Sequence, residues 1–426
     1  MIAHENVLNV TFGLRRLLKA EKYHTEKEFT IPLTELTEDK EPQIRTQIAA
    51  IAQQIAADPS LILDQTYTAE ERSRAWKNLA KLPVFTEDDE VAKLTTNMRA
   101  GHAILDHHMP HFWDVRDHTG KSVRSCVTAP ILEKALWQNL RNHSTPYSSE
   151  IRREIINTQG LASVTKYRAP VAKAIVTIFG AKHVFDPCAG WGGRMLGTLA
   201  ADDDTTYTGC EPDPATAAGL RAILSDPAIP ASRRSAARIL ELPAESALPT
   251  LVAEKFDMIL TSPPYFNLEL YNGDAQSTAQ YPTWSSWVDN WLRPVIHTAL
   301  ARLREGGVSC WSVKNFKSDR NYPLADTVKS IHEETGFVLV RTVLMTGCGR
   351  QGVNRIDAEG KPTRRSEEAT YCFQRGTVSS PTAEAPPSYA TMSKAALQDI
   401  WRQRGWKGFS TKSKEELVER LENSTT

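Results

Sequence analysis

A stiff polar turn follows an apolar run in the second half of the chain. The run FDMILT (256–261) leads directly into Ser262-Pro263-Pro264-Tyr265. Proline has no N–H group to give to a sheet, so a strand over this run must end before the prolines. Two consecutive prolines also restrict the backbone on either side, and open α/β sheets bind ligands where their strands end. The turn is therefore a candidate ligand site that carries a hydroxyl, free carbonyls and an aromatic ring.

A glycine-rich turn follows an earlier apolar strand, in VFDPCAGWGGRMLG (184–197). Gly190 and Gly192 allow the backbone to approach a ligand closely. The helix that begins there favours polar or anionic groups at its amino end. Taken alone, the pattern fits a tight strand-to-helix turn without a ligand equally well.

An acidic residue ends the next predicted strand, TYTGCEP (206–212), about 20 residues after the glycines. A carboxylate at the position of Glu211 can accept hydrogen bonds from both ribose hydroxyls of a nucleoside. The alternative is a helix cap, because Pro212 and Asp213 follow. The glycine turn and Glu211 together indicate a nucleoside cofactor.

These motifs resemble those of the S-adenosylmethionine-dependent amino-methyltransferases of DNA. That family has D-P-F-x-G-x-G on its first strand and (D/N/S)-P-P-(Y/F/W) on its fourth. The matching stretches here are Asp186-Pro187-Cys188-Ala189-Gly190-Trp191-Gly192 and Ser262-Pro263-Pro264-Tyr265. Cys188 stands where the family has an aromatic residue, which alters one wall of the cofactor pocket. The resemblance covers about Val164 to Gln374, half of the chain.

The resemblance implies S-adenosyl-L-methionine as the cofactor. Tyr167 and Arg168 would cover its methionine end, with plain helix packing as the alternative, and Glu245 would contact its adenine. The cofactor-binding candidates are Tyr167, Arg168, Asp186, Cys188, Ala189, Gly190, Trp191, Gly192, Glu211, Pro212, Glu245 and Thr261. The catalytic candidates are Ser262, Pro263, Pro264 and Tyr265.

Methyl transfer to an amino group of a base explains a stiff turn. The amino nitrogen is a poor nucleophile because its lone pair is delocalised into the ring. The Ser262 hydroxyl and the Pro263 carbonyl would orient this nitrogen and stabilise the positive charge that develops on it. Tyr265 would stack on a base flipped out of the duplex. Methylation at carbon 5 of cytosine instead needs a Pro-Cys nucleophile, and the Cys188 of DPCAG lies on the cofactor turn.

Serine in the first motif position favours cytosine N4 as the target within this family, and adenine N6 stays the main alternative. Methylation of RNA or of a protein glutamine is a weaker alternative. A DNA-binding protein that keeps the fold without catalysis is a further one. The recognition sequence, a cognate restriction nuclease and the oligomeric state are left open.

Two basic segments make double-stranded DNA the expected partner. A loop between the last two predicted strands would grip phosphates, with a solvated loop as the alternative. Its candidates are Arg350, Arg355, Lys361, Arg364 and Arg365. The tail resembles the SAP-type helix–turn–helix DNA-binding modules. Its candidates are Lys394, Arg402, Arg404, Lys407, Lys412 and Lys414.

Composition limits the class of protein. The 426 residues carry 51 basic and 51 acidic side chains, so DNA contact must come from local patches. Six scattered cysteines without a CxxC pair argue against disulfide scaffolds and zinc ribbons. No signal peptide or apolar run of about 18 residues is found, so we expect an intracellular, cytoplasmic protein, bacterial or phage-encoded. Five histidines between His102 and His118 match no zinc signature and favour a polar or DNA-facing helix, with no metal.

The elements that must hold these residues form an α/β architecture: a Rossmann-like class I methyltransferase sheet with a helical N-terminal region and a small helical C-terminal module. Residues 1–155 read as mainly helical, since isoleucines at 44, 48, 51 and 55 share one face. Residues 156–375 alternate strands and helices, which predicts a parallel sheet. Its strands are 183–187, 206–212, 256–263 and 307–313, followed by an antiparallel pair, 337–345 and 368–374. A linker (376–392) would lead to the tail (393–426).

Overall fold

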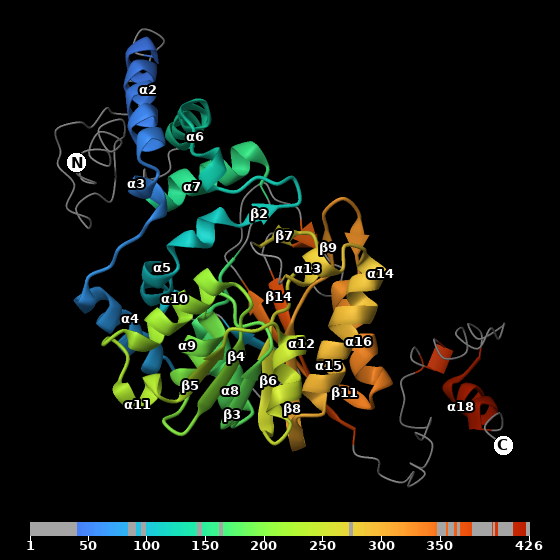
Figure 1. The fold of residues 1–426 in the computed structure, drawn as a ribbon. Helices are drawn as coiled ribbons and strands as arrows, with labels where there is room; N and C mark the ends of the chain where they lie inside the picture. The colour runs from blue at the N-terminus through green and yellow to red at the C-terminus, as the bar shows by residue number, and fades with distance from the viewer. Residues whose placement is uncertain are drawn as a thin grey trace. The chain divides into compact units, whose positions relative to one another are not determined.

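The computed structural model describes residues 41–83, 91–94, 99–142, 147–161, 165–271, 276–346, 355–356, 362–363, 367–376, 394, 397–398 and 412–422. The chain divides into two compact units, Met1–Arg375 and Gly376–Thr426. The division falls at the residue where the linker is predicted to begin. The described helices of the first 159 residues belong to the same unit as the sheet. Figure 1 draws this part of the chain in blue to green.

An eight-stranded mixed sheet forms the centre of the first unit. Its order is β1 (Val91–Leu94), β11 (Phe337–Thr346), β14 (Glu367–Arg375), β8 (Leu303–Ser312), β6 (Phe256–Thr261), β3 (His183–Asp186), β4 (Thr206–Cys210) and β5 (Ala237–Leu240). The strands from β8 to β5 are all parallel, as predicted. The β11–β14 pair is antiparallel, also as predicted, and β14 is antiparallel to β8 as well. Sequence analysis missed β1 and β5, which are only four residues long.

Helices cover both faces of the sheet, and this explains the apolar runs of its strands. One face packs on α8 (Ala169–Ile178), α9 (Gly193–Leu199) and α10 (Pro214–Ser225), together with α4 (Ala69–Ala80) and α5 (His102–His108). The other face packs on α12 (Ala244–Ala247), α14 (Trp284–Trp287), a π-helical turn η7 (Val288–Leu292), α15 (Arg293–Leu300) and α16 (Leu324–Glu334). Within β6, Met258 and Leu260 face the first layer and Ile259 faces the second, the alternation that a strand requires.

A separate hydrophobic core lies in the N-terminal part. It joins α2 (Glu41–Ala57), α3 (Ser60–Leu63), α6 (Ala129–Arg141) and α7 (Ser148–Gln159). All four isoleucines of the predicted helix face are buried there. Between this core and the sheet, β2 (Arg116–Asp117) pairs with β7 (Glu269–Leu270), which follows the proline turn closely in sequence. The N-terminal part therefore supports the segment that comes directly after β6.

The remaining short elements connect these layers. They are η4 (Pro110–Asp114), η5 (Arg124–Cys126), α11 (Ala231–Arg234), η6 (Leu248–Leu251), α13 (Ser277–Gln280), β9 (Phe316–Lys317), β10 (Asn321–Tyr322), β12 (Arg355–Ile356) and β13 (Pro362–Thr363). None of the helices in the described ranges is both long enough and apolar enough to span a bilayer.

In the second unit the structure describes α18 (Lys414–Glu422). Ser413 caps it: its hydroxyl accepts from the Glu416 N–H over 3.2 Å, and the Glu416 carboxylate accepts from the Ser413 N–H over 2.7 Å. Leu417 on this helix is buried.

Candidate functional site

One pocket opens at the carboxyl edge of the parallel strands, with about 1060 Å³ of empty space including its mouth. The chain runs from β3 to β4 and β5 on one side of the sheet and from β6 to β8 on the other. The order of the strands therefore reverses between β3 and β6, and ligands of doubly wound sheets bind at such a switch point. The glycine turn follows β3, and the proline turn follows β6.

Most of the predicted site residues line this pocket. These are Tyr167, Cys188, Ala189, Gly190, Trp191, Glu211, Pro212 and Glu245 from the cofactor set, and Ser262, Pro263, Pro264 and Tyr265 from the catalytic set. Four predicted cofactor residues do not line it: Arg168, Asp186, Gly192 and Thr261.

The glycine turn and Glu211 are joined directly. The Gly190 N–H donates to one carboxylate oxygen of Glu211 over 2.9 Å, and the Asp213 N–H donates to the other over 2.9 Å. Gly190 has a φ of 54°, in the left-handed region that favours glycine. Burial raises the pKa of the Glu211 carboxyl from 4.5 to about 7, although the two backbone N–H groups oppose this rise. The site thus presents a buried acidic acceptor at the end of β4.

Asp186 is buried behind the pocket wall and does not line the pocket. Its carboxylate is fully buried and accepts from the Cys188 N–H at 3.0 Å and from Arg194 Nε at 2.7 Å. The Tyr207 hydroxyl donates to it at 2.8 Å, and the Thr261 hydroxyl also at 2.8 Å. Asp186 therefore holds the two turns together, and its role as a cofactor contact stays a prediction.

The other three predicted cofactor residues that do not line the pocket are Thr261, Gly192 and Arg168. Thr261 ends β6 and is buried against Asp186. Gly192 precedes α9 with a φ of 81°, and a Cβ there would lie 3.0 Å from a side-chain carbon of Leu220. Arg168 is the residue before α8, and its role as a cofactor contact, with helix packing as the alternative, stays a prediction.

The proline turn contributes both polar and aromatic surface. Ser262 and Pro264 are half-buried, and Pro263 and Tyr265 are buried. The Tyr265 ring meets Phe316 at a centroid distance of 5.5 Å in an edge arrangement. Part of the Tyr265 ring is thus already covered by protein, and the part that lines the pocket remains for a ligand. Phe266, the next residue, has a φ of 40°, which is unusual for a residue other than glycine.

Glu245 has one oxygen occupied and one available. Trp291 Nε1 donates to Glu245 Oε2 over 2.9 Å. Within the described residues, the other oxygen, Oε1, is buried and has no hydrogen-bond partner. A buried carboxylate oxygen without a partner is costly, so this atom is suited to accept a hydrogen bond from a ligand.

Sequence reasoning missed several residues of the pocket wall. They are Thr165, Pro187, Gly193, Arg194, Asp213, Thr216, Pro243, Ala244, Glu269, Tyr271, Gln276, Ser277 and Trp291. Two signals could have found some of them: Glu269 and Tyr271 belong to the FNLELY stretch that continues the proline turn, and Arg194 lies in the first turn of the helix after the glycines. Gln276, Ser277 and Trp291 are brought in by tertiary packing.

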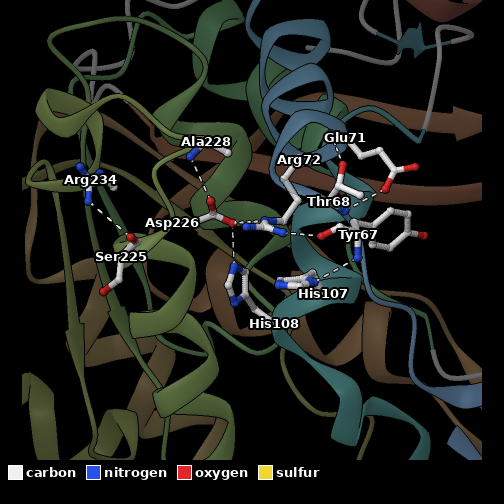
Figure 2. A network of polar contacts seen from close by, with 10 residues as sticks. All are labelled: Tyr67, Thr68, Glu71, Arg72, His107, His108, Ser225, Asp226, Ala228 and Arg234. Atoms are coloured by element: carbon white, nitrogen blue, oxygen red, sulfur yellow. Dashed lines mark hydrogen bonds and ion pairs between the residues drawn. The ribbon is translucent and has the colours of Figure 1, made fainter. Parts of the chain in front are cut away.

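Two of the five histidines, His107 and His108, belong to an interface within the first unit instead of the expected polar or DNA-facing surface (Figure 2). His118 is exposed. His108 Nε2 lies 2.8 Å from Asp226 Oδ2, and Arg72 Nε donates to the same oxygen over 2.7 Å. The Tyr67 N–H donates to His107 Nδ1 over 3.2 Å. These contacts attach α4 and α5 to the end of α10. In the part of the chain that the structure describes, no three His, Cys, Asp or Glu side chains gather as a metal would require.

Most of the predicted DNA contacts lie outside the described residues: Arg350, Lys361, Arg364, Arg365, Arg402, Arg404 and Lys407. Arg355 belongs to β12, which pairs with β13. In the second unit, Lys412 Nζ lies 3.5 Å from Glu416 Oε1, and Lys414 begins α18.

No family model matches the chain, and no curated protein matches it. Solved structures do. A precorrin-8w decarboxylase from Methanobacterium thermoautotrophicum matches half of the chain (50%) and 92% of its own, at 12% identity and a TM-score of 0.33. The match to a precorrin-6y C5,15-methyltransferase from Geobacter metallireducens covers 51% of this chain and 94% of that protein's chain, at 12% identity and a TM-score of 0.33. The match to an O-methyltransferase from Bacillus cereus covers 52% of this chain and 88% of that protein's chain, at 12% identity and a TM-score of 0.31. Each of these matches covers about half of this chain.

Proposed function

We propose that the protein is an S-adenosylmethionine-dependent DNA methyltransferase that modifies an exocyclic amino group of a flipped base, with cytosine N4 as the target. One observation carries the proposal. A glycine turn with a buried carboxylate and a Ser-Pro-Pro-Tyr turn line the same pocket from the two sides of the switch point.

The pocket residues fit the cofactor. The Glu211 carboxylate lies at the end of β4, where ribose hydroxyls are bound in doubly wound folds. The unpartnered Glu245 oxygen can accept from the amino group of an adenine. Cys188, whose thiol pKa is raised by burial, stays a neutral apolar wall. When bound, S-adenosylmethionine supplies an electrophilic methyl group.

The protein's own part in the reaction is to orient and desolvate the amino group. The Ser262 hydroxyl and the Pro263 carbonyl can accept its two hydrogens, which points the nitrogen lone pair out of the ring plane. The same acceptors stabilise the positive charge that grows on nitrogen as the bond forms. The prolines hold these acceptors in place before the substrate arrives, so little ordering is needed during transfer. Tyr265 supplies a flat surface for the base.

The first experiment is transfer of a tritiated methyl group to duplex DNA, followed by mass spectrometry of the nucleosides. We expect N4-methylcytosine from the wild type. Ser262→Ala should lower turnover by about 10²-fold, the usual effect of losing one preorganised polar group. Ser330→Ala, which removes an exposed hydroxyl on α16, is the matched control and should be fully active.

The product distinguishes the alternatives. N6-methyladenine would keep the mechanism and change the base. Tritium found in RNA or on a protein glutamine would mean that RNA or protein is the substrate instead of DNA. A 5-methylcytosine product would contradict methyl transfer to an amino group.

A further inference from the structure

A small hairpin, β9–β10, stands beside the proline turn. Its strands pair through Lys317 with Asn321 and Phe316 with Tyr322. It directly follows β8, which runs parallel to β6 with Trp311 opposite Thr261. Both strands therefore end at the same edge of the sheet, and the hairpin leaves the sheet where the proline turn does.

Three hydrogen bonds attach the hairpin to the residue two positions after Tyr265. Asn267 Nδ2 donates to Asp319 Oδ1 over 2.7 Å and to the Tyr322 hydroxyl over 3.3 Å. The Ser318 hydroxyl donates to Asn267 Oδ1 over 2.7 Å. The hydrogen bonds that the Asp319 carboxylate accepts from Asn267 and from Tyr322 hold its pKa well below the usual range. Asp319 thus stays an ionised acceptor that fixes the hairpin.

The hairpin separates apolar from cationic side chains. Phe316 and Tyr322 are buried, their rings stack at a centroid distance of 5.1 Å, and Phe316 contacts the Tyr265 ring. Lys314, Lys317 and Arg320 are exposed. Across the described part of the chain, no ion pair joins these three cations to an acidic side chain. Lys317 and Arg320 on the hairpin and Lys314, two residues before it, thus present three exposed cations. The nearby carboxylates are Asp319 and the exposed Asp326, which accepts from Asn315 Nδ2 over 2.7 Å.

We propose that the β9–β10 hairpin binds the phosphate backbone of DNA next to the base that enters the pocket, through Lys314, Lys317 and Arg320. This rests on the proposed function. A flipped nucleotide keeps its own phosphates at the mouth of the pocket, because only the base turns in. Cations on a hairpin attached to the proline turn would neutralise these phosphates without reading the sequence. The hydrogen bonds of Asn267 connect the hairpin, which would contact the DNA strand, to the turn that would orient the amino group.

The test uses the full chain and a fluorescein-labelled DNA duplex of mixed sequence, with binding followed by anisotropy from low to high salt. Each lost phosphate contact should lower the slope of log affinity against log salt by about 0.9 on B-DNA. Lys317→Glu/Arg320→Glu should therefore lower the slope by roughly 1.8 and weaken binding most at low salt. Lys317→Gln/Arg320→Gln should give the same slope without the added repulsion.

Lys255→Glu is the matched control. Lys255 is also an exposed lysine, but it precedes β6 and so lies at the opposite edge of the sheet. This variant should keep the wild-type slope. All variants should keep their affinity for S-adenosylmethionine in calorimetry, since the exchanged side chains are exposed and do not line the pocket. The Lys317 and Arg320 variants should also keep their melting temperature, whereas Lys255→Glu loses the hydrogen bond from Nζ to the Ala301 carbonyl and should melt slightly lower.

The outcomes separate the two proposals. Wild-type DNA binding with an unchanged slope in both double variants would overturn the hairpin contact and leave the proposed function standing. An equal loss in Lys255→Glu would also overturn it, because the effect would then be one of overall charge. A wild type that binds S-adenosylmethionine but no DNA would overturn both.

Discussion

The Thr261 hydroxyl donates a hydrogen bond to the Asp186 carboxylate over 2.8 Å, and this contact joins the ends of β6 and β3 across the switch point. The proline turn begins directly after Thr261, and the glycine turn begins directly after Asp186. The relative position of the two halves of the site therefore depends on a bond that neither half supplies alone.

Replacing these two residues should have graded effects. Thr261→Val keeps the shape and removes the donor, so we expect a loss of about 1–3 kcal/mol in the free energy of unfolding. Asp186→Ala leaves the buried Arg194 charge without its carboxylate and should cost about 3–5 kcal/mol. Urea unfolding monitored by circular dichroism measures both. A smaller loss for Asp186→Ala than for Thr261→Val would contradict this view of Asp186.

The two glycines of the turn should respond differently to alanine. At Gly193 a Cβ would lie 1.9 Å from the Tyr167 carbonyl oxygen, so Gly193→Ala must displace the wall that carries Tyr167. At Gly190 the nearest atom would be 3.8 Å away, and the cost is that of a φ of 54°, about 1 kcal/mol. We expect calorimetry to show loss of S-adenosylmethionine binding in Gly193→Ala and weakened binding in Gly190→Ala. Equal affinities of the two variants for S-adenosylmethionine would contradict the close packing of Gly193 against Tyr167.

Cofactor affinity should depend on pH through Glu211. Because burial raises its pKa from 4.5 to about 7, the ligand-free fold holds this proton more tightly than the unfolded chain does. The resulting stabilisation is full below pH 4.5 and is lost as the pH rises through 7. The ionised form is the better acceptor for ribose hydroxyls, so affinity should rise with pH to a plateau above 7. Titrations from pH 5.5 to 8.5 test this, and Glu211→Gln should bind weakly with no such rise.

Loss of the Asp226 carboxylate should loosen α4 and α5 from α10. Burial raises the pKa of Asp226, but hydrogen bonds from Ala228, His108 and Arg72 outweigh it and lower the pKa overall. Its stabilising contribution is therefore present above pH 3.8 and is lost as the pH falls below that value. Asp226→Ala should lower the melting temperature at pH 7 more than at pH 3. Hydrogen exchange should rise in α5, and a uniform rise across the sheet would contradict a local role.

The second unit should add affinity without chemistry. A chain that ends at Arg375 keeps every residue that lines the pocket, so turnover on short duplexes should persist. Binding to long DNA should weaken, with a shallower salt dependence, because a tethered second contact is lost. Unchanged binding at every salt concentration would contradict the SAP-like interpretation.

Local sequence signals predicted the parts of the fold that depend on local patterns. The apolar runs of β3, β4, β6 and β8 and the antiparallel β11–β14 pair follow from alternation and spacing. β1 could not be found, since four residues gain their strand character from pairing with β11. The motif gives the position of Asp186 in the chain but neither the direction of its side chain nor its hydrogen-bond partners. Its four hydrogen bonds come from residues between 2 and 75 positions away.

The pairing of β1 with β11 has a consequence for synthesis on the ribosome. Val91 to Leu94 emerge early, yet their partners, Thr342 to Met345, are made roughly 250 residues later, which at ~5–20 residues per second is tens of seconds. During that time the β1 segment has no place in a sheet. Because the partner is so distant in sequence, this edge of the sheet is completed only after β11 has been made, and until then the β1 segment has to be kept from pairing elsewhere.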